Sequence, residues 1–159
     1  MSHALAYAKI DGYELVGLCT RNIDKVELPP QLQGVAKFND FETALEELKP
    51  DVVSVNTMPD THADFAIKAM EAGAHVFVEK PMAISAADAE RVVEVAKRTN
   101  RKLVIGYILR QHPSWIKFIE IAREVSATCQ RSPRAESATG AVRMSAPFPA
   151  VRPVLAWRA

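Results

Sequence analysis

The sequence predicts an α/β fold built on a doubly wound, parallel sheet. Two observations predict it: short apolar segments rich in β-branched residues recur along residues 1–125, and segments with a helical apolar stripe alternate with them. The apolar segments do not alternate with polar residues, as is typical of strands buried on both faces of a parallel sheet. A chain of 159 residues is long enough for one domain of ordinary size.

The predicted strands are short. They are Leu15–Cys19, Val35–Phe38 (the weakest), Val52–Val55, Val76–Val78 and Leu103–Ile105.

The predicted helices have recognisable starts and stops. Asp40 is the N-cap candidate of a helix whose apolar stripe runs from Phe41 to Leu48, and Pro50 stops that helix. The other signals are Asp60 or Thr61 as an N-cap with Gly73 as the stop, Ser85 as an N-cap with Asp88 at the capping-box position, and Pro113 as an opening residue. A further helix is expected at Ala4–Ala8.

Composition narrows the class of protein. The net charge of +1 offers no basic field for nucleic acid, and no apolar stretch approaches the ~20 residues that cross a bilayer. Cys19 and Cys129 match no metal-ligand spacing, so we expect no metal site. Cys19 lies in an apolar run, which favours an inert core thiol. With no signal peptide at the start, we expect a cytoplasmic protein.

The amino-acid composition changes after about Val125. Residues 126–159 hold five Arg, no Lys and a single acid, and four prolines interrupt the segment. We therefore expect residues 1–125 to form the domain and 126–159 to be an irregular tail, either disordered or the product of a shifted reading frame. A basic interaction arm is the alternative for the tail.

Several short motifs stand in a specific order. One is Asn56-Thr57-Met58-Pro59 with His62, the second runs from Ala72 to Glu79-Lys80-Pro81, and the third is Gly106-Tyr107 followed by Arg110 and Pro113. Together they resemble the Gfo/Idh/MocA oxidoreductases, a family that includes glucose–fructose oxidoreductase and inositol dehydrogenase. The resemblance covers residues 3–124 and implies a Rossmann-type, NAD(P)-binding domain.

The resemblance also implies residue roles. Lys80 is the expected catalytic residue, because an ammonium just past a strand end can stabilise charge on a substrate oxygen or help proton transfer; the alternative is a solvated surface lysine. Arg110 is a weaker candidate for substrate binding, with a surface salt bridge as its alternative. The expected cofactor-binding residues are Thr20, Arg21, Asn56, Thr57, Pro59, His62, Glu79, Lys80 and Pro81.

The residues after the strand at Leu15–Cys19 bear on the choice of cofactor. NAD-specific enzymes of this fold usually place an acid there to bind the ribose 2′-hydroxyl. Thr20 stands at that position and Arg21 follows it. A neutral residue followed by a cation favours NADP over NAD, unless Arg21 is simply exposed.

Two parts of the family pattern are missing from the sequence. The glycine-rich turn G-x-G-x-x-G is absent, and His3 resembles a histidine that follows that turn in the family. We therefore expect a sheet without its usual first strand. Three outcomes are then possible between the strands at Leu15–Cys19 and Val52–Val55: a gap, direct pairing of these two strands, or a substitute strand between them. Residues 126–159 have no His and no Asp, and we expect no substrate domain in them.

These observations lead to one leading function and two alternatives. The leading function is hydride transfer between NAD(P) and a sugar, a polyol or a related small carbonyl compound, with this chain alone inactive. The alternatives are a non-catalytic nucleotide-binding or interaction module, and a non-functional gene remnant. The oligomeric state cannot be inferred from the sequence.

Overall fold

The structure, a computed structural model, describes residues 2–129 and 153–157. Its strands are β1 (Glu14–Cys19), β2 (Ala36–Phe38), β3 (Val52–Val55), β4 (His75–Val78), β5 (Leu103–Ile105) and β6 (Pro153–Trp157). Its α-helices are α1 (Ser2–Tyr7), α2 (Phe41–Leu48), α3 (His62–Glu71), α4 (Ala86–Thr99) and α5 (Pro113–Cys129). The strands and helices expected before Val125 are therefore all present, and the predicted α/β class is confirmed.

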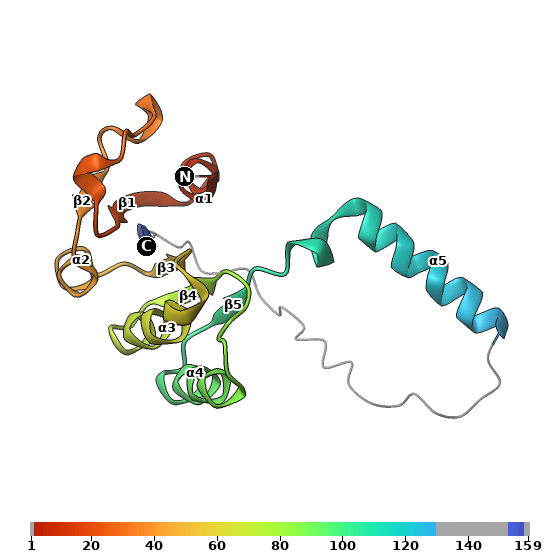
Figure 1. Cartoon of the computed structure of the whole chain (residues 1–159). Coiled ribbons are helices and arrows are strands. Elements are labelled where there is room, and N and C mark those ends of the chain that lie inside the picture. Colours follow the sequence, from red (N-terminus) through yellow and green to blue (C-terminus); the bar gives the residue numbers. More distant parts are fainter. Residues whose placement is uncertain (1, 130–152, 158–159) are drawn as a thin grey trace. The chain divides into compact units, whose positions relative to one another are not determined.

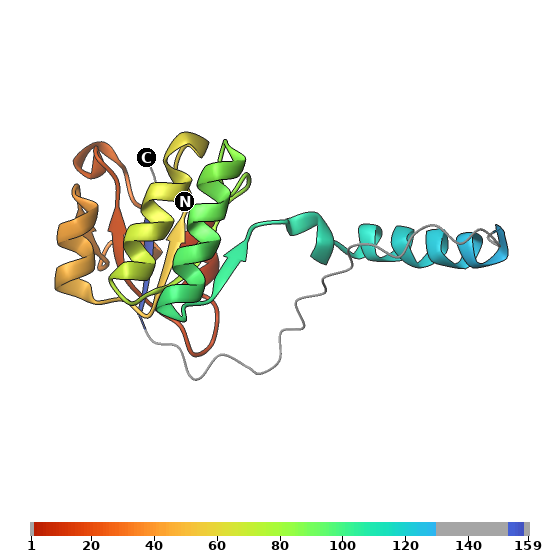
Figure 2. The ribbon, with the colours of Figure 1, turned by 90° about the horizontal axis from the view of Figure 1, so that it is seen from below.

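The strands form one parallel sheet in the order β2-β1-β6-β3-β4-β5. A doubly wound sheet of the Rossmann type has the strand order 3-2-1-4-5-6, in which the first strand is central. Here β6 takes that central position, between β1 and β3 (Figure 2). Of the outcomes expected for the gap, the substitute strand is the one that the structure shows.

Two parts of residues 126–159 are regular in the described part of the chain. Residues 153–157 form β6, and α5 continues to Cys129. The physical reason for β6 is that the facing edges of β1 and β3 offer backbone donors and acceptors that need partners. Residues 130–152 and 158–159 lie outside the described part of the chain, so the disorder or frameshift prediction is not tested there.

Helices α1 to α4 cover both faces of the sheet (Figure 1). On one face, α1 and the segment that follows β1 bury a small cluster, formed by Ala4, Leu18, Ile23, Leu28 and Leu32. On the other face, α2, α3 and α4 pack over the larger core, which includes Val53, Val55, Val76 and Val78 from the sheet. The whole of β3 and the second half of β1 are thus buried, as their apolar runs predicted. The edge strands β2 and β5 are only partly buried or exposed.

The expected N-cap residues of three helices stand at the N-cap position, and two of them make the side-chain capping bond. The Asp40 side chain accepts a hydrogen bond from the Thr43 backbone N–H at 2.8 Å, and Ser85 Oγ accepts one from the Asp88 backbone at 3.1 Å. Thr61 stands at the N-cap of α3, but its hydroxyl makes no capping bond. The hydroxyl instead bonds to oxygens of the preceding loop, Met58 O and Thr57 Oγ1, which compete with the helix N-terminus for this side chain.

The described residues divide into two compact units. One contains the chain up to Gly106 together with β6, and the other contains α5 and the 3₁₀ turn before it, Ile108–Gln111. The domain boundary expected near Val125 stays a prediction. None of the helices in the described residues has the length and hydropathy needed to span a membrane.

Candidate functional site

The carboxyl ends of the strands form one row across the sheet. Each strand's last residue pairs with that of its neighbour, in the sequence Phe38, Cys19, Trp157, Val55, Val78 and Ile105. Backbone bonds continue this row by one residue: Thr20 N–H donates to Phe38 O at 3.0 Å, Glu79 N–H to Val55 O at 3.0 Å and Gly106 N–H to Val78 O at 2.8 Å.

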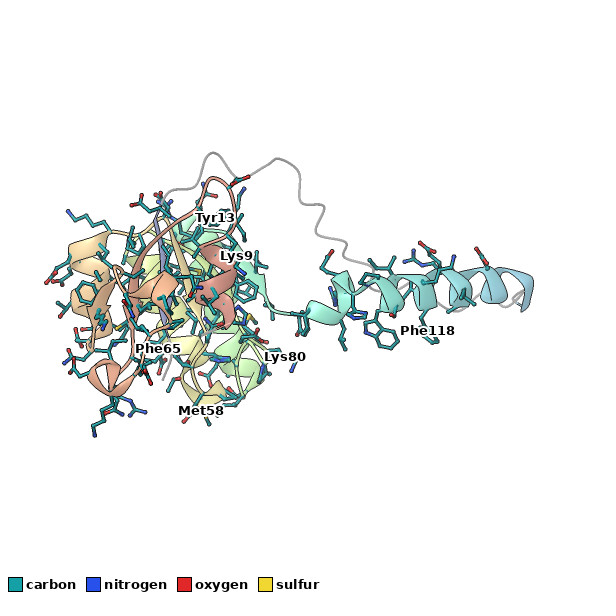
Figure 3. All side chains as sticks on the ribbon, turned by 90° about the horizontal axis from the view of Figure 1, so that it is seen from above. Lys9, Tyr13, Met58, Phe65, Lys80 and Phe118 are labelled. Atoms are coloured by element: carbon teal, nitrogen blue, oxygen red, sulfur yellow. The ribbon has the colours of Figure 1, made fainter. Side chains whose placement is uncertain are left out.

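The residues that follow the strands therefore share one edge. Thr20, Asn56 and Lys80 each come just after a strand in the sequence, and this register places all three at the same edge. Figure 3 shows Lys80 and Met58 at the same end of their unit, with Tyr13, which precedes β1, at the opposite end. Ligands of open α/β sheets bind beyond the carboxyl ends of the strands.

Lys80 is exposed at this edge, directly after Glu79 and before a cis peptide bond to Pro81. Within residues 3–124, its ammonium group makes no ion pair or side-chain hydrogen bond. The charge is therefore available to a ligand.

Glu79 is held from three directions. Its carboxylate accepts a hydrogen bond from the Lys80 backbone N–H at 3.1 Å and lies 3.1 Å from His3 Nε2 on α1. It also lies over Gly106, where an added Cβ would come within 3.1 Å of the carboxyl atoms. Glu79 therefore joins α1 to the ends of β4 and β5, and the space that it fills explains a glycine at position 106.

A second set of polar side chains is joined by hydrogen bonds near Asn56. The Tyr7 hydroxyl of α1 donates to Ser54 Oγ at 3.1 Å, and Asn56 Nδ2 donates to Ser54 Oγ at 3.0 Å and to Ser54 O at 3.2 Å. Ser54 is fully buried in β3. Burial raises the pKa of Tyr7, and its bond to Ser54 opposes part of that increase. Ser54 and Tyr7 were not among the predicted site residues. The available signal was a serine inside an apolar strand.

Asn56 offers one unused acceptor. Its Oδ1 is buried and has no hydrogen-bond partner among the described residues. A buried acceptor without a partner is costly, and a ligand hydroxyl at the edge would satisfy it. The polar groups at this edge therefore fit a dinucleotide, whose ribose hydroxyls can donate to such an oxygen.

His62 is placed differently from the other candidates. The residue is 1% exposed at the start of α3, and its two ring nitrogens face the backbone oxygens of Pro81 and Thr57. Both nitrogens are thus occupied by the protein, so direct contact between this ring and a cofactor is not supported by the geometry.

The remaining candidates are spread over the edge and beyond it. Thr20, Thr57 and Pro59 are half-buried, while Arg21 and Pro81 are exposed. Arg110 lies in the other compact unit, where its guanidinium sits 5.0 Å from the centre of the Tyr107 ring. Its substrate-binding role remains a prediction. The described residues contain no group of three His, Cys, Asp or Glu side chains that could hold a metal ion.

Comparison with known proteins decides the family. The model of the Gfo/Idh/MocA oxidoreductases, described by their NAD-binding Rossmann fold, matches residues 1–107. The chain belongs to this family. The resemblance inferred from the ordered motifs is thereby confirmed, together with the Rossmann fold and the oxidoreductase class.

Several members of the family share this part of the chain. Inositol 2-dehydrogenase from Salmonella typhimurium is 29% identical over 115 residues, which cover 70% of this chain and 34% of the relative. A 3-ketoreductase variant from Actinomadura kijaniata, solved with TDP-benzene and NADP, has a TM-score of 0.69 at 24% identity, covering 76% of this chain and 37% of that one. Scyllo-inositol dehydrogenase from Lactobacillus casei, solved with NAD(H) and scyllo-inositol, has a TM-score of 0.64 at 24% identity, covering 79% and 37%.

The chain spans about a third of the length of these proteins. The family is described by an NAD-binding Rossmann fold. The 3-ketoreductase structure holds NADP and the scyllo-inositol dehydrogenase structure holds NAD(H), so the comparisons give no choice between the two cofactors for this chain.

Proposed function

We propose that this chain forms the cofactor-binding part of an oxidoreductase that transfers hydride between NAD(P) and a sugar, a polyol or a related small carbonyl compound. The observation that carries the proposal is the single carboxyl edge at which Asn56, Glu79 and Lys80 meet. The substrate class rests on relatives that are inositol dehydrogenases and a 3-ketoreductase.

Lys80 is the residue proposed to act on the substrate. Its exposed ammonium group stands beyond the end of β4, free of carboxylate partners in residues 3–124. There it would stabilise negative charge on the substrate oxygen, or donate a proton to it in the reductive direction. The nicotinamide, when bound, supplies the hydride chemistry.

The cofactor contacts are proposed to come from the loops after β1, β3 and β4. The Oδ1 atom of Asn56 would accept a hydrogen bond from a ribose hydroxyl, which would remove its buried, unpaired state. Thr57, Pro59, Glu79 and Pro81 would line the same loops.

The choice of NADP over NAD is proposed on the end of β1. Thr20 carries no negative charge that would repel a 2′-phosphate, and the exposed guanidinium of Arg21 could pair with that phosphate bidentately.

Titration of the ¹⁵N-labelled chain with NADPH and with NADH tests both parts of the proposal. We expect weak binding, with a Kd above ~10 μM, or about −7 kcal/mol, because the sequence has no glycine-rich turn to hold the pyrophosphate. Amide shifts should nevertheless concentrate at residues 20–21, 56–59, 79–82 and 106. Shifts concentrated at the amino ends of the strands, or none at millimolar cofactor, would contradict the proposed site.

The variant Arg21→Ala tests the preference for NADP. It should weaken NADPH binding by roughly tenfold, or 1.4 kcal/mol, and leave NADH binding unchanged. Arg98→Ala is the matched control, because Arg98 pairs with Glu71 between α3 and α4, at 2.6 Å. Equal affinities of Arg21→Ala and the unsubstituted chain for NADPH would remove the argument for NADP.

Turnover by this chain alone is not expected. The match covers about a third of each relative's length, and we propose that the chain reduces no sugar or carbonyl compound by itself. Steady oxidation of NADPH in the presence of inosose or a ketosugar, abolished by Lys80→Met, would show that this expectation is wrong.

A further inference from the structure

His62 bridges the two loops that carry the proposed site. Its Nδ1 lies 2.6 Å from the Pro81 carbonyl oxygen, in the turn that contains Lys80. Its Nε2 lies 2.9 Å from the Thr57 carbonyl oxygen, in the loop that contains Asn56. The side chain is 1% exposed, so water does not compete for either contact.

The chemistry of these contacts restricts what the ring does. A carbonyl oxygen only accepts hydrogen bonds, so a ring nitrogen that bonds to it must carry a hydrogen. The neutral ring has one N–H, and only the doubly protonated ring can donate from both nitrogens. The shorter contact is the one to Pro81, which favours a hydrogen on Nδ1.

The loop after β3 is fixed to the start of α3 by a separate set of bonds. The Thr61 hydroxyl lies 2.7 Å from Thr57 Oγ1 and donates to Met58 O at 2.8 Å. The first turn of α3 and the Thr57 loop therefore move together. The bond from His62 to Pro81 then links this joined unit to the neighbouring turn.

We propose that His62 is a positioning residue, which donates a hydrogen bond from Nδ1 to the Pro81 carbonyl and so holds the Lys80 turn at a fixed place relative to Asn56. It acts through the two loops and touches neither cofactor nor substrate. Its effect on cofactor binding rests on the proposed function, whereas the bond itself and the rigidity of the turn do not.

The ring state is tested by ¹⁵N NMR of the imidazole nitrogens. The chain has four histidines, so His62 is assigned by the signals that vanish in His62→Phe. We expect its Nδ1 to show the shift of a protonated nitrogen and its hydrogen to exchange slowly. A bare Nδ1 would overturn the proposal.

Amide exchange tests whether the ring positions the turn. His62→Phe keeps an aromatic ring and removes the hydrogen bond to Pro81, so the amides of Lys80 and Met82 should exchange about fivefold faster, the factor for one ordinary hydrogen bond. The amides within β3 and β4 should be unchanged. His62→Asn retains a side-chain N–H near the place of Nδ1 and should restore most of the protection. It also provides the test if the phenylalanine variant does not fold.

His75→Phe is the matched control. His75 opens β4 at the opposite edge, where its Nδ1 accepts a bond from the Lys102 backbone at 3.1 Å. This substitution should leave exchange at Lys80 and Met82 unchanged. Equal exchange of the turn in folded His62→Phe and the unsubstituted chain would refute the positioning role.

Cofactor titration separates this inference from the proposed function. If NADPH binds at the edge, His62→Phe should weaken it about fivefold and His62→Asn should recover most of the loss. If NADPH does not bind, the proposed function fails, while the ring spectrum and the exchange rates still decide the role of His62.

Discussion

A proline within β6 should destabilise the whole sheet. Leu155 pairs with Gly17 of β1 and with Val53 of β3, so β6 is hydrogen-bonded on both sides. A proline at position 155 has no N–H to donate, so a backbone carbonyl oxygen of an adjacent strand loses its hydrogen-bond donor. Val53 is fully buried, so water does not replace that donor easily.

The magnitude follows from the lost bond. A buried acceptor left without its donor costs about 1–3 kcal/mol, against a total stability of about 5–15 kcal/mol for a typical domain. At about 4 °C per kcal/mol for a domain of roughly 100–150 residues, Leu155→Pro should lower Tm by roughly 4–12 °C. Circular dichroism measures the shift, and Asp11→Pro, in the exposed turn before β1, is the control.

Deletion of residues 153–159 tests the same reasoning more severely. Without β6, the facing edges of β1 and β3 lose their partners, and amides of Leu15–Cys19 and Val52–Val55 should exchange with solvent. The exposed edges should also promote association between chains. If the shortened chain melts at the temperature of the full chain, with both edges still protected, then β6 does not complete the sheet in solution.

Three further predictions concern single side chains. Gly106→Ala should cost roughly 1 kcal/mol, because the new Cβ meets the Glu79 carboxylate at 3.1 Å, and an unchanged Tm would show that this carboxylate moves freely. Hydrogen bonds from the Thr43 side chain and backbone lower the pKa of Asp40, so its contribution to stability is present above about pH 3.9 and is lost as pH falls through the folded-state pKa. Asp40→Asn should therefore show a weaker loss of Tm between pH 5 and pH 2 than the unsubstituted chain, and parallel curves would contradict this. Burial raises the pKa of the Cys19 thiol, so iodoacetamide at about pH 8 should label this residue only after unfolding; rapid labelling of the folded chain would be inconsistent with its burial.

The sequence was sufficient for the elements whose signals are local. β3 was predicted from three valines around one serine, α2 from an apolar stripe that follows a capping residue, and α4 from its capping residues. Because strands of a parallel sheet end at a common edge, the positions of Asn56 and Lys80 followed from the strand ends alone. These inferences need only the chain's immediate neighbours and the parallel topology.

The sequence was insufficient where a partner lies far along the chain. Residues 153–157 do not alternate with a predicted helix as the other strands do, and the prolines of this segment, Pro153 among them, argued against a strand. Their pairing with β3 and β1 depends on edges about 100 and about 140 residues away along the chain. The bonds of His62 to Pro81 and of Tyr7 to Ser54 have the same origin, since they span 19 and 47 residues.

The position of β6 separates two roles that one strand performs in the usual doubly wound fold. There, the central strand completes the sheet and also leads through a glycine-rich turn into the first helix, whose N-terminus faces the pyrophosphate. Here β6 takes the central place, but α1 stands at residues 2–7 and does not follow it along the chain. A strand can therefore restore the backbone pairing of β1 and β3 without supplying the turn that binds phosphate. Sheet stability and cofactor affinity should accordingly respond to different changes. Leu155→Pro should lower Tm, whereas Arg21→Ala should weaken NADPH binding and leave the free energy of unfolding within about 0.5 kcal/mol of its original value. A Leu155→Pro chain that loses NADPH affinity at a temperature where it is still fully folded would show that β6 also contributes to the phosphate site.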